Sequence, residues 1–274
     1  MSDYQCIRVE TIAPALGAVI HEVDCRANLS GRVIEEIRKA WLQHLVVFFP
    51  DQNLEPAEQL AFARRFGVPA EYPMVQGMIG IPEVVQVVKL PHEAHNFGGI
   101  WHSDTTYLEQ PPIGALLLAR ELPPVGGDTL FANMYLAYDA LSEGMKSLLD
   151  NLIVVQSSAK AGAARSREDR LSDESTVAKQ ALEAEHPAVR THPETGRQVL
   201  FVNYGHSVRF KDMTEAESKP VLDYLFAHQT RPEFTCRFQW SVGSMAMWDN
   251  RCTQHNPIND YHGFKRVMHR ISIN

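Results

Sequence analysis

The sequence predicts a mainly β domain with flanking helices, arranged as a sandwich or jelly roll. Its 274 residues match a length that β-rich cores often reach as one domain. Short apolar runs separated by turn residues recur in the C-terminal half, which is typical of antiparallel strands. Segments with apolar residues at helical spacing lie before and between them. We therefore expect a single domain over residues 1–274.

The first 120 residues are expected to form two helices and three strands. Ser30 can cap a helix over residues 31–44, and Pro56 begins a second helix that stops at Gly67. The apolar run 45–49 predicts a buried strand between these helices, closed by a Pro-Asp turn. Strands are also expected at residues 84–90 and 114–120.

The remaining chain is expected to alternate between helices and short strands. Residues 133–152 look helical with a break near Ser142, and a further helix is expected over 214–228. Residues 157–185 are polar and charged, which predicts a mobile loop or lid, with a solvated surface excursion as the alternative. The expected strands are 188–192, 199–203, 234–240, 244–248 and 264–273.

Charge and cysteine content narrow the class of partner. Lys and Arg number 26 against 33 Asp and Glu, a net charge of −7 that argues against nucleic acid or an anionic membrane as partner. The four cysteines lack Cys-x-x-Cys spacing, which predicts reduced thiols in a cytoplasmic protein. We see no signal peptide, and the longest apolar run, 113–119, is far below the roughly 20 residues of a membrane span. A small molecule is the expected partner.

Two short motifs predict a metal site. On a strand, His102 and Asp104 would point to the same side and could bind one ion, although His-x-Asp alone is a weak signal. His255 follows a turn after a strand, where its side chain can point inward. Two histidines and one carboxylate leave coordination positions open, as non-haem Fe(II) requires to bind a cosubstrate and O₂. Zinc could use the same ligands for hydrolysis, so these residues alone leave the metal open.

Two further segments could bind an anion. Arg266 and Arg270 face one way on the last strand, either towards solvent or inward, where a guanidinium pairs with a carboxylate through two hydrogen bonds. In Gly126-Gly127-Asp128-Thr129 the glycines permit a tight turn, and the Thr129 hydroxyl can donate to an anion. A plain β-turn is the alternative for this second segment.

Taken together, these motifs resemble the taurine and chlorophenoxyacetate dioxygenase (TauD/TfdA) family of Fe(II)- and 2-oxoglutarate-dependent oxygenases. The resemblance extends nearly from end to end. It is carried by His102-x-Asp104, Gly126-Gly127-Asp128-Thr129, Trp248-Asp249-Asn250-Arg251, Thr253-Gln254-His255, Arg266 and Met268-His269-Arg270, with Arg65-Phe66-Gly67 near the N-terminus.

The resemblance implies a double-stranded β-helix (jelly-roll) core, with His102, Asp104 and His255 as Fe(II) ligands. It implies 2-oxoglutarate and O₂ as cosubstrates, with Thr129 and Arg266 on the distal carboxylate of 2-oxoglutarate. Arg270 would lie beside the site, against the cosubstrate or an anionic substrate. The implied reaction hydroxylates a substrate C–H bond and releases succinate and CO₂; desaturation and cleavage are other outcomes of such chemistry.

The sequence also bears on the substrate and on the oligomeric state. Family members that take taurine carry a histidine shortly after the Phe-Gly pair, and residues 68–73 contain none, which argues against taurine. The candidate substrate contacts are Asn96, Thr105, Tyr107, His206 and Arg270. The family often forms dimers or tetramers, so a homo-oligomer is expected. A zinc-dependent hydrolase with the same triad and a non-catalytic jelly-roll binding protein are the alternatives.

Overall fold

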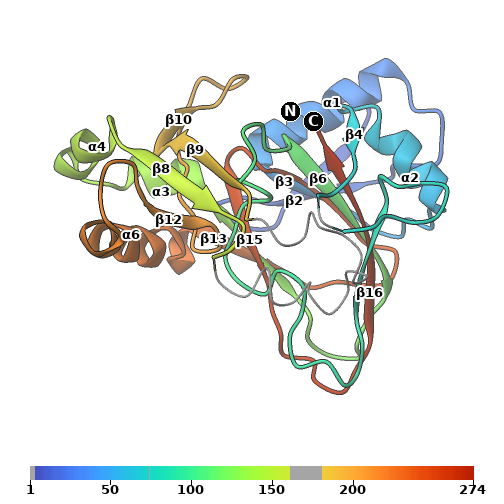
Figure 1. Ribbon diagram of the computed structural model, residues 1–274. Coiled ribbons are helices and arrows are strands. Elements are labelled where there is room, and N and C mark those ends of the chain that lie inside the picture. The colour runs from blue at the N-terminus through green and yellow to red at the C-terminus, as the bar shows by residue number, and fades with distance from the viewer. Residues whose placement is uncertain (1–3, 74, 161–180) are drawn as a thin grey trace.

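Two β-sheets packed face to face form the centre of the computed structural model, which describes residues 4–73, 75–160 and 181–274. Phe48 of the larger sheet stacks on Phe238 of the smaller one with ring centroids 3.8 Å apart. Trp248 of the larger sheet lies 5.9 Å from Phe131 of the smaller one. Helices cover the outside of both layers (Figure 1). The predicted class, mainly β with flanking helices, is confirmed.

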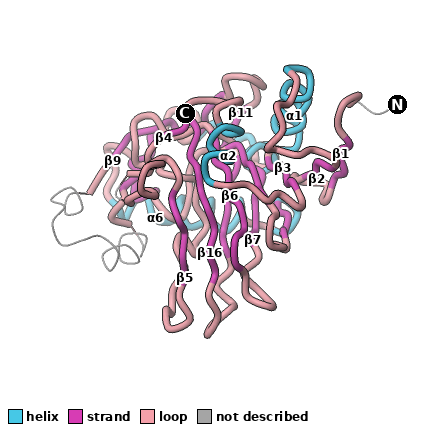
Figure 2. The backbone as a smooth tube through the Cα atoms, turned by 90° about the vertical axis from the view of Figure 1, so that its right-hand side faces the viewer, coloured by secondary structure: helices cyan, strands magenta, loops and turns pink. Residues whose placement is uncertain are grey.

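The larger sheet has eight strands, and all its pairings are antiparallel except that of β2 with β3. Figure 2 shows β5, β16 and β6 side by side in it. Its strands, in spatial order, are β1 (Arg8–Thr11), β2 (Ala18–His21), β3 (Val46–Phe49), β14 (Met245–Asp249), β6 (Gly114–Glu121), β16 (Arg266–Ile273) and β4 (Pro69–Ala70), with β5 (Val85–Lys89) also paired to β16.

The smaller sheet lies against it and contains, in order, β13 (Thr235–Phe238), β7 (Thr129–Asn133) and β15 (Thr253–Pro257), all antiparallel. Two small sheets extend this layer (Figure 1). One contains β12 (Ser207–Phe210), β8 (Ile153–Ser157) and β9 (Glu183–Pro187), and the other pairs β10 (Val189–Thr191) with β11 (Gln198–Leu200).

Helices cover the outer faces, and their caps follow from the sequence. The Ser30 hydroxyl accepts from the Val33 amide, and Thr214 and Glu217 form a reciprocal capping box. The helices are α1 (Gly31–His44), α2 (Pro56–Ala63), α3 (Met134–Asp139), α4 (Glu143–Leu149) and α6 (Glu215–Gln229), with a 3₁₀ turn over Pro232–Phe234. No helix in the described ranges has the length and apolar character needed to cross a membrane.

The central strands of the larger sheet are buried on both faces, which explains their continuous apolar runs. Val46 and Phe48 pack into the core between the sheets, whereas Val47 and Phe49 pack into a second core under α1 and α2. The strand β14 alternates in the same way, so Trp248 faces the space between the sheets. This space contains the candidate site.

Most predicted elements are found, with three differences. The second helix ends at Ala63, four residues before Gly67, because Arg64 begins a turn. Six strands were not predicted, since each has only two to five residues and gives a weak periodic pattern: β1, β2, β4, β8, β9 and β15. The lid expected over 157–185 overlaps strands at both ends, where Ser157 pairs with Glu183. Its residues 161–180 lie outside the described part of the chain.

Candidate metal centre and anion pocket

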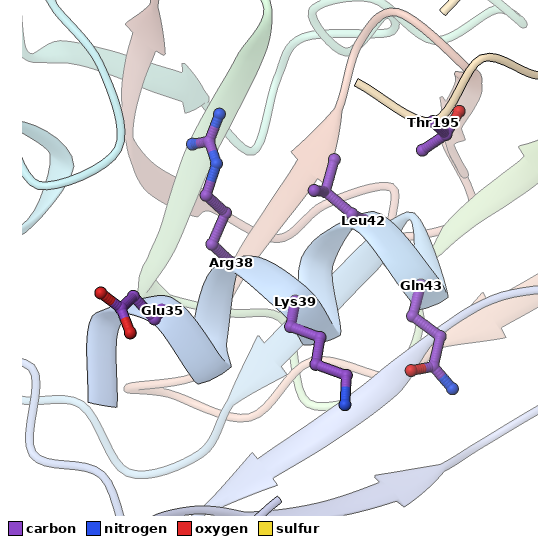
Figure 3. Close-up of a pocket in the computed structure, with 6 residues that line it drawn as sticks. All are labelled: Glu35, Arg38, Lys39, Leu42, Gln43 and Thr195. Carbon is purple, nitrogen blue, oxygen red and sulfur yellow. The ribbon is translucent and has the colours of Figure 1, made fainter. Parts of the chain in front are cut away.

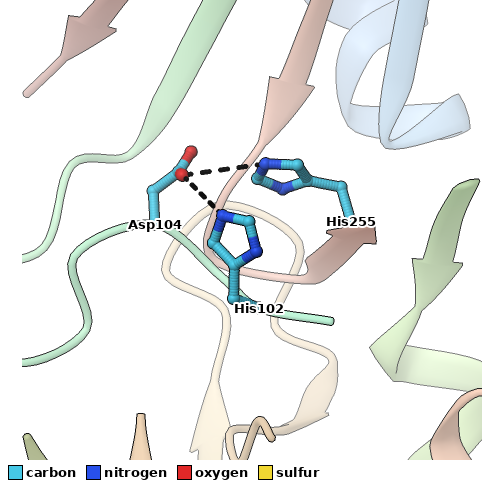
Figure 4. A group of neighbouring side chains, drawn as sticks. All are labelled: His102, Asp104 and His255. Atoms are coloured by element: carbon cyan, nitrogen blue, oxygen red, sulfur yellow. Dashed lines mark ion pairs between the residues drawn. The ribbon is translucent and has the colours of Figure 1, made fainter. Parts of the chain in front are cut away.

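The three residues predicted as metal ligands come together between the two sheets (Figure 4). His255 lies on β15, and His102 is joined to it by an isolated antiparallel bridge. The two backbone hydrogen bonds of this bridge measure 3.0 and 2.8 Å. Asp104 lies in a turn, so the expectation that His102 and Asp104 share a regular strand was wrong. The bridge, and not a strand, positions His102.

The ligand atoms face a common point. Both histidine Nε2 atoms are directed at Oδ1 of Asp104, at 3.6 Å for His102 and 3.8 Å for His255. The three side chains are buried. Nδ1 of His102 is 2.7 Å from the carbonyl oxygen of Ile100, and because a carbonyl only accepts, this nitrogen carries the proton. Nε2 of His102 therefore presents a lone pair, as a metal ligand must.

Asp104 is fixed by groups from β14 and the turn after it. Asn250 accepts from the Asp104 amide at 2.6 Å and donates to the Asp104 carbonyl at 3.0 Å. Nε1 of Trp248 donates to Oδ2 of Asp104 at 3.1 Å. Trp248 and Asn250 belong to a sequence motif, but the sequence did not predict that they hold Asp104 in place.

The protonation states of Asp104 and His255 favour the binding of a cation. Burial alone would raise the pKa of the Asp104 carboxyl, but Arg270 and the two imidazoles hold that pKa well below its usual range. Burial, aided by nearby His102, lowers the pKa of His255 well below its usual value. The centre therefore combines a carboxylate with a neutral imidazole, which is the protonation state that metal binding requires.

A cavity next to the triad holds the predicted anion-binding residues. Arg266 and Arg270 are 5% and 4% exposed, so they do not face solvent. Nε and Nη2 of Arg266 have no hydrogen-bond partner among the described residues. Thr129 lies in the same cavity, where its hydroxyl accepts from Nε1 of Trp240 at 3.0 Å and can still donate to an anion. The lining consists of Val87, Phe97, His102, Leu117, Thr129, Phe131, Trp248, His255, Pro257, Arg266 and Arg270.

Arg270 links the cavity to the triad. Its Nη2 lies 2.7 Å from Oδ1 of Asp104, and its guanidinium lies over the Tyr72 ring at 4.7 Å from the centroid. Tyr72 itself is buried and contacts Phe97 edge to face at 6.0 Å. Tyr72 and Phe97 therefore place an aromatic wall beside the guanidinium.

The tentative substrate contacts are all buried close to this site. The His206 ring lies 6.1 Å from the His102 ring and 5.0 Å from the Tyr107 ring, in a turn before β12. Thr105 follows Asp104 with a positive φ of 46°, a strained backbone for a β-branched residue. Asn96 donates to the carbonyl of Pro257 at 2.9 Å. Of these four residues, none is among those that line the cavity.

A second buried cluster, formed by His192, Asp249 and Cys252, is a hydrogen-bonded network. Nδ1 of His192 accepts from two backbone amides, so Nε2 carries the proton and donates to Asp249 at 3.1 Å. Arg251 binds the same carboxylate through two nitrogens, at 2.8 and 2.6 Å. Burial raises the pKa of the Cys252 thiol well above its usual value. His192 therefore offers no free nitrogen and Cys252 no thiolate to a metal, so this cluster is not a metal site in its present hydrogen bonding.

A shallow hollow on the outer face of α1 is remote from this chemistry (Figure 3). It is lined by Glu35, Arg38, Lys39, Leu42, Gln43 and Thr195. Arg38 is paired with Glu194 at 2.7 Å. The hollow contains no group poised for catalysis, so the cavity beside the triad is the candidate site.

Comparisons with known proteins place the whole chain among sequences of one family. A family described as "Taurine catabolism dioxygenase TauD, TfdA family" matches residues 8–272. An alpha-ketoglutarate-dependent sulfate ester dioxygenase of Pseudomonas putida is 34% identical over 97% of this chain and 88% of its own length. An (S)-phenoxypropionate/alpha-ketoglutarate dioxygenase of Sphingobium herbicidovorans is 31% identical over 94% of this chain and 92% of its own.

A solved structure is also similar over almost the whole chain. The crystal structure of AAD-2 in complex with Mn(II) and N-oxalylglycine has a TM-score of 0.84 and 26% identity. The match covers 98% of each chain.

Proposed function

Because this chain belongs to the TauD, TfdA family of dioxygenases, we propose that it binds Fe(II) through His102, Asp104 and His255 and oxidises a small anionic molecule. The chain is an alpha-ketoglutarate-dependent dioxygenase, and its fold is the predicted jelly roll.

The triad fits Fe(II). Two imidazole nitrogens and one carboxylate oxygen face a common point inside the protein, which is the donor set of non-haem iron oxygenases. When bound, the iron supplies the activation of O₂ and of the substrate C–H bond. Asn250 and Trp248 orient Asp104, and the bridge to His255 orients His102, so the ligands are held before a metal arrives.

The buried guanidinium of Arg266 is the observation on which the proposal depends. A buried guanidinium with unsatisfied N–H groups is costly unless an anion pairs with it. The 2-oxoglutarate distal carboxylate supplies that charge, with Thr129 donating a further hydrogen bond from the same cavity. A zinc hydrolase or a simple binding protein would leave this charge in the metal cavity unexplained.

The remaining side chains bind and orient the reactants. Phe97, Leu117 and Phe131 line the cavity with apolar surface, which excludes water from the reacting atoms. Arg270 belongs to this lining and keeps Asp104 ionised, so an anionic group bound there lies next to the metal ligands. This placement holds the substrate close to the centre that oxidises it.

We propose that the substrate is a small organic sulfate or an aryloxy carboxylate. The sulfate ester and phenoxypropionate dioxygenases are similar to this chain over most of its length. Arg270 can bind either anion, and the adjacent Tyr72 and Phe97 can contact the organic part. Residues 68–73 contain no histidine, so taurine is not the proposed substrate.

The test is anaerobic binding followed by a substrate screen. Fe(II) and 2-oxoglutarate added together should give a weak visible charge-transfer band that neither gives alone. Alkyl sulfates, aryloxy carboxylates, sulfonates and amino acids would then be screened for substrate-dependent succinate release. A protein that binds Zn(II) and hydrolyses esters without consuming 2-oxoglutarate would contradict the proposal.

We also propose that residues 1–274 act as one domain in the cytoplasm and assemble as a dimer or tetramer. The four cysteines are all free, which supports a reducing compartment such as the cytoplasm. Light scattering of the purified protein would measure the assembly.

A further inference from the structure

Lys89 is a buried cation that the proposed chemistry does not yet use. It lies on β5 directly opposite Arg266 of β16, in the antiparallel register of the larger sheet. Opposed residues of an antiparallel pair project from the same face, and Val87, two residues before Lys89, lines the metal cavity. Lys89 is 2% exposed, so it lies inside the protein beside the anion pocket.

No counter-ion contacts Lys89 within the described residues. Its Nζ has no hydrogen-bond partner there, and it lies 4.4 Å from the centroid of the Tyr261 ring. Two carboxylates close to Arg266 in the fold are paired with other cations: Asp128 directly precedes Thr129, and Glu121 lies opposite Val267. Asp128 pairs with Arg237 at 2.6 Å, and Glu121 pairs with Lys265 at 2.8 Å.

Tyr261 connects the two cations. The Arg266 guanidinium carbon lies 6.0 Å from the centroid of the same ring whose face contacts Lys89. Burial raises the pKa of the Tyr261 hydroxyl while the Arg266 charge opposes that rise, so this phenol stays neutral. An aromatic ring attracts a cation but does not neutralise it. Two positive charges therefore lie at one buried ring, and one of them, Arg266, lines the pocket.

Such a pair is unfavourable in a protein without an anion. Like charges placed opposite each other on a sheet repel, and burial strengthens the repulsion because it removes the screening of water. A dianionic ligand turns this net repulsion into a net attraction, because one bound carboxylate is attracted by both cations. The arrangement is suited to a pocket that is occupied by an anion during its working cycle.

We propose that Lys89 is a second cation for the distal carboxylate of 2-oxoglutarate and acts across Tyr261 to reinforce Arg266. This inference rests on the proposed function, because it takes 2-oxoglutarate as the ligand at Arg266. Lys89 is a positioning residue: its charge selects a dicarboxylate over a monocarboxylate 2-oxo acid.

The experiment compares two ligands on the Mn(II)-loaded protein by titration calorimetry. 2-Oxoglutarate carries the distal carboxylate, and 2-oxopentanoate has the same chain length without it. Lys89→Met should weaken 2-oxoglutarate binding on the order of tenfold and leave 2-oxopentanoate binding unchanged. Lys89→Arg should restore most of the preference, because it restores the charge. Lys265→Met is the matched control, since Lys265 is half-exposed and paired with Glu121, and it should behave as the wild type.

A stability measurement excludes a merely structural role. Without ligands, Lys89→Met should melt no lower than the wild type because a repulsive charge is gone, and 2-oxoglutarate should raise its melting temperature less. Lys89→Gln gives the same comparison if the methionine variant does not fold. If Lys89→Met weakens the binding of 2-oxoglutarate and 2-oxopentanoate equally, or leaves the binding of both unchanged, the proposed role of Lys89 is wrong. A wild-type protein with no preference for 2-oxoglutarate would instead overturn the proposed function.

Discussion

Nη2 of Arg270 lies 2.7 Å from Oδ1 of Asp104, the same oxygen that the Nε2 atoms of His102 and His255 face. Arg270 and Asp104 are both almost completely buried. The metal centre and the anion pocket therefore share one carboxylate, and a change at Arg270 affects both.

The first prediction concerns this ion pair. Arg270→Met leaves Asp104 buried without its cation, which should lower the free energy of unfolding of the metal-free protein by about 3 kcal/mol. Mn(II) supplies a replacement charge, so the loss should be much smaller for the loaded protein. Urea unfolding with and without Mn(II) measures both values. An equal loss in the two states would show that the pair does not compensate Asp104.

The second prediction tests the ligand set. His102→Ala should abolish Mn(II) binding and reduce substrate-dependent succinate release to background, because two ligands cannot retain the ion. His262→Ala is the control, since His262 is exposed. Retention of metal and turnover by His102→Ala would remove His102 from the ligand set.

The third prediction concerns Arg266. Arg266→Met should raise the KM for 2-oxoglutarate at least about 30-fold, the lower end of what loss of a buried charge partner costs. Mn(II) binding should persist, because the triad is intact. Thr129→Val should raise the same KM only several-fold, since one neutral hydrogen bond is worth about 1 kcal/mol. If both variants keep the wild-type KM, the distal carboxylate binds elsewhere.

The fourth prediction concerns Asn250. Asn250→Ala removes both hydrogen bonds to the Asp104 backbone, so metal affinity should fall about 10- to 100-fold, as is typical when a residue that orients a ligand is lost. Asn151→Ala, at an exposed position, should leave metal affinity unchanged. Mn(II) titration measures both, and equal affinities would contradict a supporting role for Asn250.

The fifth prediction is a pH dependence of stability. Burial, together with the charge of Arg190, lowers the pKa of His186, whose Nε2 donates to the carbonyls of Thr106 and Leu108. The unfolded chain therefore binds the proton more tightly, and stability should fall as the pH drops below about 6.5 towards the folded-state pKa. Glutamine keeps a donor but does not titrate, so His186→Gln should flatten the decline. Melting temperatures between pH 7.5 and 5 measure both slopes. A variant as pH-sensitive as the wild type would exclude His186 as the cause.

The sequence was sufficient for elements whose caps and apolar periods are local. Ser30 caps the helix that was expected after it, and Ser142 caps α4 at the expected break; Thr214, expected as the first helical residue, is the cap of α6. It was insufficient for β16, because alternation cannot identify the inner face of a strand that is buried on both sides. Ile271 packs under the helices, while Arg266 and Arg270 face the cavity between the sheets.

The candidate site was predictable by residue type but not by local conformation. The motifs contain the triad residues, yet the bridge between His102 and His255 joins segments that lie far apart in the sequence. Lys89 gave no signal at all, since its importance depends on being opposite Arg266. Register between distant strands is a tertiary property, and a single sequence does not specify it.

The bridge between His102 and His255 also makes the placement of these two ligands independent of the length of the chain between them. Two backbone hydrogen bonds set the distance between these ligands, whatever the intervening segment contains. Insertions or deletions in surface loops between them should therefore leave the metal ligands in place, provided that both backbone hydrogen bonds of the bridge still form. The same catalytic centre can thus be retained while the loops that choose the substrate are remodelled.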